Sequence, residues 1–280
     1  MGYIYMVLSA FSFCLMTVFV KIVGQDIGTF QIIFFRGLFT LLITLLIIKK
    51  KKVYPWGVNK KILIYRGLSG TLALFFVYES IQRLSLSEAT VIQYLYPIFT
   101  TLLASLLIAE KSTKYIYIAI TLGLTGVYVI LNFPFISLDT SLNIKNVYIA
   151  LIGSFLTGLA YVLVRHASKK KESPYVIMLY FPLFTVPISL PFTILNWSTP
   201  DFQTWVLLFL VGLCTQLGQT FLTFGYKLLP ASNAATASYA QVPFAALAGF
   251  FIFYESISYN FIFGSFLIFL AILVIIRKDN

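Results

Sequence analysis

The chain has 280 residues, of which 60% are hydrophobic and 10% are charged, and its mean hydropathy is +0.93. Soluble domains carry roughly 25% charged residues, so this composition excludes an ordinary soluble protein and indicates a membrane protein. A net charge of +11 would point to nucleic acid in a soluble chain. Here the basic residues lie between apolar runs, so we expect them to orient the chain and to meet the lipid bilayer, and we expect no nucleic acid partner.

Apolar runs of roughly 20 residues, each long enough to cross a bilayer as a helix, recur along the chain. They predict an all-α polytopic membrane protein with ten transmembrane helices and no separate soluble domain. In chain order, the predicted helices are Tyr3–Val23, Thr29–Ile48, Ile62–Ile81, Ala89–Ala109, Tyr115–Leu131, Val147–Val164, Tyr175–Leu195, Trp205–Tyr226, Ala231–Tyr254 and Phe261–Ile276.

The lysine-rich connections indicate the orientation of the chain. Four lysines follow the second predicted helix at 49–52, and three follow the sixth at 169–171. With ten helices these connections share one side of the membrane, whereas nine or eleven helices would separate them. Cytoplasmic loops carry an excess of Lys and Arg. We therefore expect a multi-pass protein of the cell (inner) membrane with both termini in the cytoplasm.

Sequence features of the first half of the chain recur in the second half. Segments and single landmarks recur at offsets of 144 to 146 residues, which a shared apolar bias alone would not produce. The aligned pairs are 14–21 with 158–165, 32–40 with 177–185, Thr90 with Thr236, Pro97 with Pro243 and Glu110 with Glu255. We predict two five-helix repeats, residues 1–135 and 146–280. Because five is odd, the repeats are inverted relative to each other, as in many transporters.

Taken in order, the motifs resemble the drug/metabolite transporter superfamily and, within it, the ten-helix EamA-type exporter family. The resemblance covers essentially the whole chain, and it implies a 5+5 inverted repeat, a central cavity and small-metabolite substrates. It also implies that the fifth and tenth helices lie at the periphery, in some members at a homodimer contact. The motifs are Val20-Lys21, Phe34-Phe35-Arg36, Arg66-Gly67, Ala89-Thr90, Gln93, Pro97 to Glu110, Tyr239, Gln241 and Phe253-Tyr254-Glu255.

Three charged residues lie inside apolar runs, where such charges usually face a cavity, a partner or the interface, and two of them, Arg36 and Glu79, are candidate site residues. Arg36 is either a cationic anchor for a carboxylate or phosphate or a helix-packing residue. Arg66, one turn into the third helix, is expected to extend to the interface. Glu79 either pairs with Arg83 four residues on, or binds a cationic group or a proton near the outer cavity mouth.

Polar faces on the fourth, eighth and ninth helices are the predicted walls of the cavity. Residues at i, i+3 and i+7 share a helix face, and the fourth and ninth helices carry matched polar residues at this spacing. Proline inside a span frees a carbonyl and can bend the helix at a gate. Gln216 and Gln219 share a face of the eighth helix, and contact substrate or bond between helices. The other predicted substrate contacts are Thr90, Gln93, Thr236 and Tyr239, and the predicted gating residues are Pro97 and Pro243.

These features predict a secondary transporter that exports a small polar or amphipathic metabolite by alternating access. The alternative is uptake or exchange of a nutrient such as an amino acid, a nucleoside or an S-adenosylmethionine-like compound. Arg36 facing the cavity favours an anionic or zwitterionic substrate, and Glu79 facing it favours a cationic one.

Other classes of function find little support in the sequence. No metal, nucleotide or cofactor motif is present, so we expect coupling to protons or to a counter-substrate. A membrane enzyme is disfavoured, because the single histidine, His166, belongs to no catalytic or zinc-binding motif.

Overall fold

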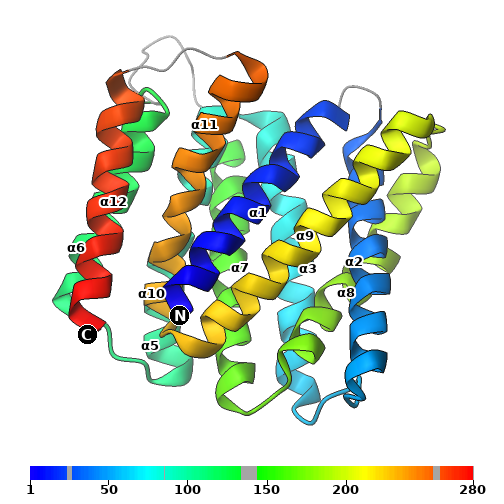
Figure 1. Ribbon diagram of the computed structural model, residues 1–280, viewed down its shortest axis with the longest axis horizontal. Helices are drawn as coiled ribbons and strands as arrows, with labels where there is room; N and C mark the ends of the chain where they lie inside the picture. The colour runs from blue at the N-terminus through cyan, green and yellow to red at the C-terminus, as the bar shows by residue number, and fades with distance from the viewer. Residues whose placement is uncertain (24–26, 85, 134–143, 255–258, 280) are drawn as a thin grey trace.

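The computed structural model describes residues 1–23, 27–84, 86–133, 144–254 and 259–279. Every regular element in these ranges is a helix, which confirms the predicted all-α class (Figure 1). The elements are α1 Gly2–Val23, α2 Thr29–Lys51, α3 Lys60–Arg83, α4 Leu86–Gln93, α5 Tyr96–Ile108, α6 Lys114–Ile130, α7 Ile144–Lys169, α8 Pro174–Leu195, α9 Phe202–Leu228, α10 Ala231–Ala237, the 3-10 turn η1 Ser238–Ala240, α11 Gln241–Phe253 and α12 Tyr259–Asp279.

The helices account for the ten predicted membrane spans. Within the described ranges, nine helical segments are long and apolar enough to cross a bilayer, and α6 is a tenth, shorter apolar helix. Two of the nine segments, Ala89–Ile108 and Ala231–Phe253, each combine more than one helix. The chain is therefore a polytopic helical membrane protein.

The fourth predicted helix, Ala89–Ala109, is not continuous, which corrects the prediction. It is divided into α4 and α5 at residues 94–95. Pro97 has no N–H with which to bond the carbonyl of Gln93, four residues earlier. That carbonyl instead accepts a hydrogen bond from the hydroxyl of Ser154 in α7, at 3.0 Å. Proline therefore ends one helix and begins another here, where the sequence predicted only a bend.

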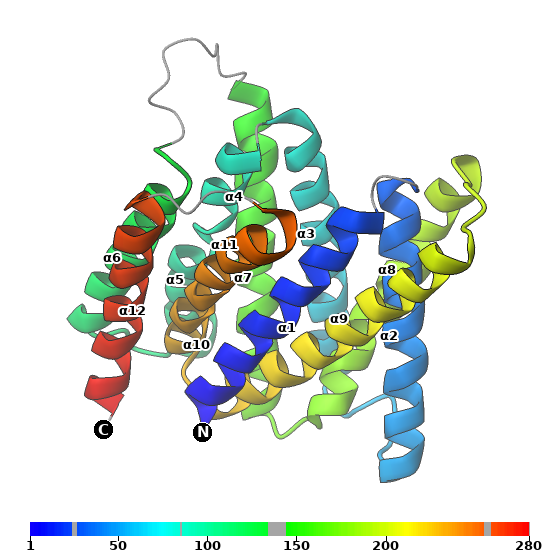
Figure 2. The same ribbon diagram turned by 45° about the horizontal axis from the view of Figure 1, so that its top comes forward.

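The ninth predicted helix, Ala231–Tyr254, is interrupted as well, as α10, η1 and α11. The interruptions of the two spans contact each other. The hydroxyl of Tyr239 in η1 donates to the carbonyl of Tyr94 at 3.1 Å, and the ring centroids of these two tyrosines are 5.8 Å apart. A free carbonyl at membrane depth is costly, so this contact stabilises both interruptions. Figure 2 shows α5 beside α10.

The remaining helices pack in pairs along the bundle. α1 packs against α9 and α3 against α7, while α2 packs against α8 and α6 against α12. If each helix of the first half is exchanged with its counterpart in the second half, the same set of pairs results, which agrees with a repeat. The inverted 5+5 relation itself stays a prediction. The α6–α12 pair forms one flank of the molecule (Figure 1) and approaches closely, since a Cβ added to Gly126 would lie 2.6 Å from the carbonyl oxygen of Gly264.

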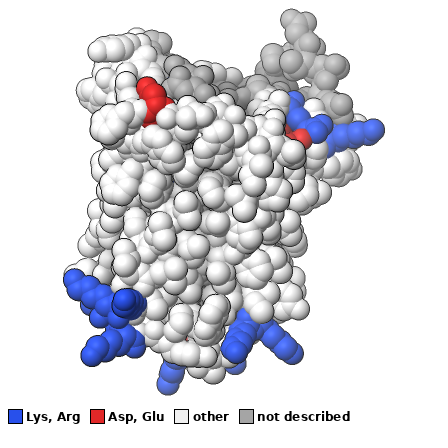
Figure 3. Space-filling view, turned by 90° about the vertical axis from the view of Figure 1, so that its right-hand side faces the viewer, with Lys and Arg blue, Asp and Glu red and all other residues white. Residues whose placement is uncertain are grey.

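Both termini lie at one end of the bundle, together with the α2–α3 and α7–α8 connections (Figure 1). We call this the basic end, because the lysines at 49–52, 60–61 and 169–171 lie there. The face in Figure 3 shows Lys and Arg gathered at this end, an uncharged middle, and a few charges at the opposite end. Such a distribution is typical of a protein that crosses a bilayer.

Candidate substrate cavity

A cavity of about 190 Å³ lies among eight helices of the bundle, with walls from α1, α2, α3, α4, α7, α8, α9 and α11. Pockets for drug-sized ligands measure roughly 300–1,000 Å³, so this cavity fits a small metabolite. Its polar lining residues are Arg36, Arg66, Gln93, Thr157, Tyr161, Gln219 and Gln241. Its apolar lining residues include Phe13, Met16, Ala73, Leu74, Val77, Ala160 and Phe181.

Arg36 faces this cavity and is buried, with 6% of its surface exposed. Within the described part of the chain, its guanidinium has a single hydrogen-bond partner, the sulfur of Met16 at 3.8 Å. Thioether sulfur is a weak acceptor, so this contact leaves most of the guanidinium donors available. The structure thus puts the Arg36 charge in the cavity wall, where one of the two sequence interpretations placed it.

Arg66 is the second arginine of the cavity, and the prediction that it extends to the interface is wrong. It is 2% exposed, its Nη2 donates to Oε1 of Gln219 at 3.3 Å, and its guanidinium lies 5.1 Å from the ring centroid of Phe181. The absence of a side chain at Gly70 makes room for it, because a Cβ there would lie 2.4 Å from Arg66 Nη1. Its Nε is buried and has no hydrogen-bond partner in the described residues.

Three glutamine side chains add hydrogen-bonding groups to the cavity. Gln93, the last residue of α4, donates to the hydroxyl of Thr157 at 3.1 Å. Its Oε1 is buried without a partner in the described residues. Gln241, the first residue of α11, and Gln219 also line the cavity. The two interrupted spans therefore each bring a glutamine to the cavity at the point where a helix ends or begins.

Of the predicted site residues, Arg36, Gln93 and Gln219 line the cavity, and the others lie outside this lining. Glu79 accepts from Arg83 Nε at 2.7 Å in an exposed i,i+4 pair. Gln216 accepts a hydrogen bond from the hydroxyl of Thr44 in α2, at 3.0 Å. It therefore bonds between helices, which is the second of the two roles that the sequence suggested for it.

Thr90 and the predicted residues of the ninth span also lie apart from the lining. Thr236 is fully buried and donates to the carbonyl of Ser232 at 2.9 Å, and Tyr239 contacts Tyr94 at the interruption. Pro97 lies at the start of α5 and Pro243 near the start of α11. The prolines are thus close to the interruptions rather than in the cavity wall.

Sequence reasoning missed several lining residues, among them Arg66, Thr157, Tyr161, Phe181 and Gln241. One local signal was available for Arg66: Gly70 follows it at i+4, on the same helix face, where a small residue leaves space for a long side chain. The other four come from helices whose packing partners lie far away in the sequence.

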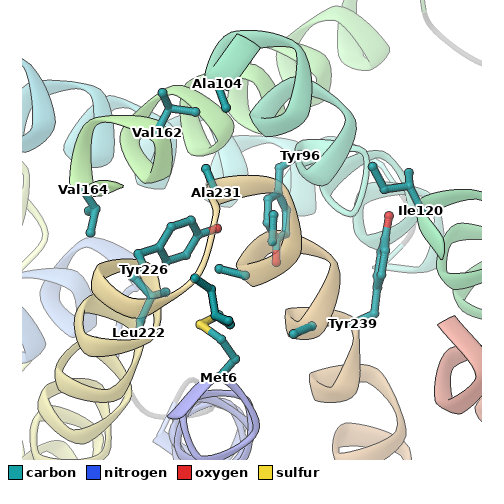
Figure 4. Close-up of a cluster of buried hydrophobic side chains, with 14 of the residues drawn as sticks. Met6, Tyr96, Ala104, Ile120, Val162, Val164, Leu222, Tyr226, Ala231 and Tyr239 are labelled. Carbon is teal, nitrogen blue, oxygen red and sulfur yellow. The ribbon is translucent and has the colours of Figure 1, made fainter. Parts of the chain in front are cut away.

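Apolar and aromatic side chains pack tightly next to the cavity. The main cluster of buried apolar residues lies in the half of the molecule near the termini, and Figure 4 shows Met6, Tyr96 and Tyr226 within it. Tyr161, at the edge of the cavity, packs edge-on against Tyr96 with ring centroids 5.4 Å apart. The centroid of Tyr226 is 5.3 Å from that of Tyr161. The three rings thus join the cavity wall to the buried apolar cluster.

Glu110 ties four helical segments together at the basic end. One carboxylate oxygen accepts from Arg165 Nε at 2.7 Å and lies 3.6 Å from Lys169 Nζ, and the other accepts from the backbone N–H of Ala231 at 2.8 Å. Arg165 Nη1 in turn donates to the backbone carbonyls of Tyr226 and Lys227, at 3.2 and 2.9 Å. The group joins the end of α5 to α7, α9 and α10.

Glu172 makes a second tie at this end, between two connections. Its side chain accepts from the backbone N–H of Val58 at 2.9 Å and from Asn59 Nδ2 at 2.8 Å, and it is 6% exposed. The α2–α3 and α7–α8 connections are thereby held together. Glu110 and Glu172 thus tie helices and connections together at the basic end.

A helical membrane bundle with two interrupted spans beside a polar central cavity has the architecture of a secondary transporter. The comparison with known families agrees. The chain belongs to the EamA-like transporter family, whose sequence model matches twice, at residues 1–132 and at residues 144–277.

Named relatives are transporters with different substrates. The chain is 25% identical over 282 residues to the pseudopaline exporter CntI of Pseudomonas aeruginosa, covering 100% of this chain and 97% of that protein. It is 30% identical over 259 residues to human solute carrier family 35 member G1, covering 88% of this chain and 70% of that protein. It is also 25% identical over 273 residues to the S-adenosylmethionine uptake transporter of Rickettsia prowazekii, covering 93% of this chain and 87% of that protein.

The fold is similar to that of a solved crystal structure, with a TM-score of 0.83. It covers 98% of this chain and 97% of its own, at 16% sequence identity. At that identity the likeness supports the fold alone.

Proposed function

We propose that this protein exports a small polar metabolite across the cell membrane by alternating access around the central cavity. The observation that carries the proposal is the cavity itself, which is lined by two arginines and three glutamines. The interruptions of the two broken spans lie beside the cavity, and such breaks provide points about which half-helices can move. Pro97 and Pro243, near these breaks, are the proposed gating residues.

The basic end is proposed to face the cytoplasm, because cytoplasmic loops carry the excess of Lys and Arg. Both termini would then be cytoplasmic. In that orientation, the tyrosine packing and the Glu110 and Glu172 ties would lie on the cytoplasmic side of the cavity, where we propose that they hold the inner gate shut. The α6–α12 pair lies at the flank of the bundle, where the proposed homodimer contact would form.

The lining favours an anionic or zwitterionic substrate over a cationic one. Arg36 faces the cavity, whereas Glu79 lies outside its lining in an exposed pair with Arg83. Proton coupling or exchange for a counter-substrate would supply the energy. Uptake is the second candidate direction, because the similar Rickettsia protein is named an uptake transporter.

Vesicle flux measurements test this proposal. Everted membrane vesicles with and without the protein are incubated with a defined mixture of small metabolites, and the vesicle contents are measured by mass spectrometry. We expect saturable, protein-dependent accumulation of a small set of compounds, which in everted vesicles corresponds to export; accumulation in right-side-out vesicles instead would indicate uptake.

Two glutamines of α9 provide a matched comparison in that assay. Gln219→Ala removes a lining amide, whereas Gln216→Ala removes an amide that bonds Thr44 away from the cavity. We expect the first variant to raise KM and the second to retain wild-type KM in equal amounts of folded protein. No protein-dependent flux with any metabolite, or equal KM values for both variants, would contradict the proposal.

A further inference from the structure

Two buried arginines share the wall of the cavity, and no carboxylate joins them among the described lining residues. An arginine side chain stays charged under all ordinary conditions. A charge at membrane depth is costly without a partner of opposite sign. The cavity of the free protein therefore holds two positive charges whose compensation is incomplete.

The acidic side chains that the structure describes are engaged elsewhere. Among those whose side chains the structure describes, each one pairs with a basic residue outside the cavity or accepts hydrogen bonds from the backbone at a helix or loop end. These residues are Glu79, Glu110, Glu172 and Asp201. A zwitterionic substrate would bring an ammonium group into a lining that offers it no described carboxylate and two guanidinium groups.

The polar atoms left without partners point to a ligand that accepts and donates hydrogen bonds. Arg66 Nε is a buried donor without a described partner, and Arg36 has only the Met16 sulfur in the described residues. Guanidinium groups bind carboxylate and phosphate oxygens with strong charge-assisted hydrogen bonds. Gln93 Oε1 is a buried acceptor without a described partner, and it suits a hydroxyl on the ligand.

Building on the proposed transport function, we infer that the cavity binds a small organic dianion, with one anionic group at Arg36 and the other at Arg66. Phe181, whose ring lies beside the Arg66 guanidinium, and the apolar side chains of Leu74 and Val77 line the same cavity, and this apolar surface suits the short carbon skeleton of such a ligand. The volume of about 190 Å³ restricts that skeleton to a few carbon atoms. Dicarboxylates and phosphate monoesters share this chemistry.

Binding to the purified full-length protein in detergent tests the inference apart from transport. The probes are malate and glycerol 3-phosphate as dianions, butyrate as a monoanion, alanine as a zwitterion and putrescine as a dication. Affinity is measured by calorimetry and by the saturable rise in Tm. We expect at least one dianion to bind about tenfold or more tightly than butyrate, because its second charge gains a charge-assisted hydrogen bond. The preferred dianion separates the carboxylate from the phosphate source.

Three glutamine substitutions identify the residues responsible. Arg36→Gln and Arg66→Gln are each expected to lower dianion affinity about tenfold or more. Arg83→Gln removes an arginine of the exposed Glu79 pair and should leave the affinity unchanged. Should Arg66→Gln fail to fold, Arg66→Lys keeps the charge but loses the forked donor, and is expected to weaken dianion binding to an intermediate degree.

The outcomes separate this inference from the proposed function. Three results would overturn the inference. The first is tighter binding of putrescine or alanine than of either dianion, and the second is no binding of either dianion up to 10 mM, about tenfold above the upper end of ordinary KM values. The third is a dianion affinity that is equal in the wild type and in both cavity variants. Dianion binding without flux in vesicles would support the inference and overturn transport. Flux of a neutral or cationic compound would support transport and overturn the inference.

Discussion

The ion pair between Glu110 and Arg165 at the basic end is predicted to stabilise this structure far more than an exposed ion pair would. Its side chains are 12% and 16% exposed, and its N–O distance is 2.7 Å. Two unit charges about 4 Å apart attract by roughly 4 kcal/mol at an effective dielectric constant of about 20. Partial desolvation offsets some of this. We therefore expect a coupling free energy of about 2–3 kcal/mol.

The Glu79–Arg83 pair is a control within the same chain. It has the same charges and an equally short contact, but its arginine and glutamate side chains are 49% and 38% exposed. Exposed i,i+4 pairs contribute about 0.3–0.5 kcal/mol. Because the contact geometry is similar, a difference between the two pairs reports the effect of burial.

Double-mutant cycles measure both coupling energies. Glu110→Gln, Arg165→Gln and the double variant are unfolded reversibly in mixed detergent micelles, and the free energies of unfolding are compared. Glu79→Gln and Arg83→Gln are treated in the same way. A coupling at Glu110–Arg165 no larger than that at Glu79–Arg83 would refute the reasoning that burial makes this pair a tie across the basic end.

Three further predictions follow from local geometry. Gly158→Ala should lower the free energy of unfolding by about 1–3 kcal/mol, because the added Cβ would lie 2.9 Å from Phe99 Cβ in α5. Gly28→Ala is the control, because a Cβ there would have no atom within 4 Å, and it should cost less than about 1 kcal/mol. Equal losses of stability for the two variants in thermal unfolding would contradict this prediction. Tyr239→Phe should cost roughly 1 kcal/mol in the same assay, since it removes the hydroxyl that bonds the carbonyl at the interruption of the other span; no loss would mean that this bond does not stabilise the fold. In right-side-out vesicles, a membrane-impermeant maleimide should label Trp197→Cys and not Lys51→Cys, because the basic end is proposed to face the cytoplasm. The two native cysteines are buried and should give little background labelling. Labelling of Lys51→Cys and not Trp197→Cys would mean that the topology is the reverse of the proposed one.

The membrane spans could be predicted from the sequence because each depends on its own run of apolar residues. Their interruptions could not be located in the same way. Pro97 predicts a disturbed helix, but whether the helix bends or ends depends on a partner for the carbonyl of Gln93. That partner, Ser154, comes from a helix about 60 residues away.

Site residues were predictable where a local rule decided their position. The Glu79–Arg83 pair follows from i,i+4 spacing, and the structure contains it. The cavity position of Arg66 depends instead on Phe181 and Gln219, in α8 and α9. Polar faces could be recognised on α9 and η1, but whether Gln216 or Tyr239 faces the cavity is decided by contacts with Thr44 and Tyr94. Contacts between distant segments leave no pattern in a single sequence.

The central claim is that substrate crosses the membrane through this cavity. Purified protein in proteoliposomes tests it most directly, with two substitutions on the same helix. Leu74→Trp places an indole in the cavity, whereas Leu72→Trp, at a position that is 43% exposed and outside the lining, presents it away from the cavity. We predict that substrate flux is abolished by Leu74→Trp and retained by Leu72→Trp at equal Tm. Retained flux in a folded Leu74→Trp protein would contradict the account.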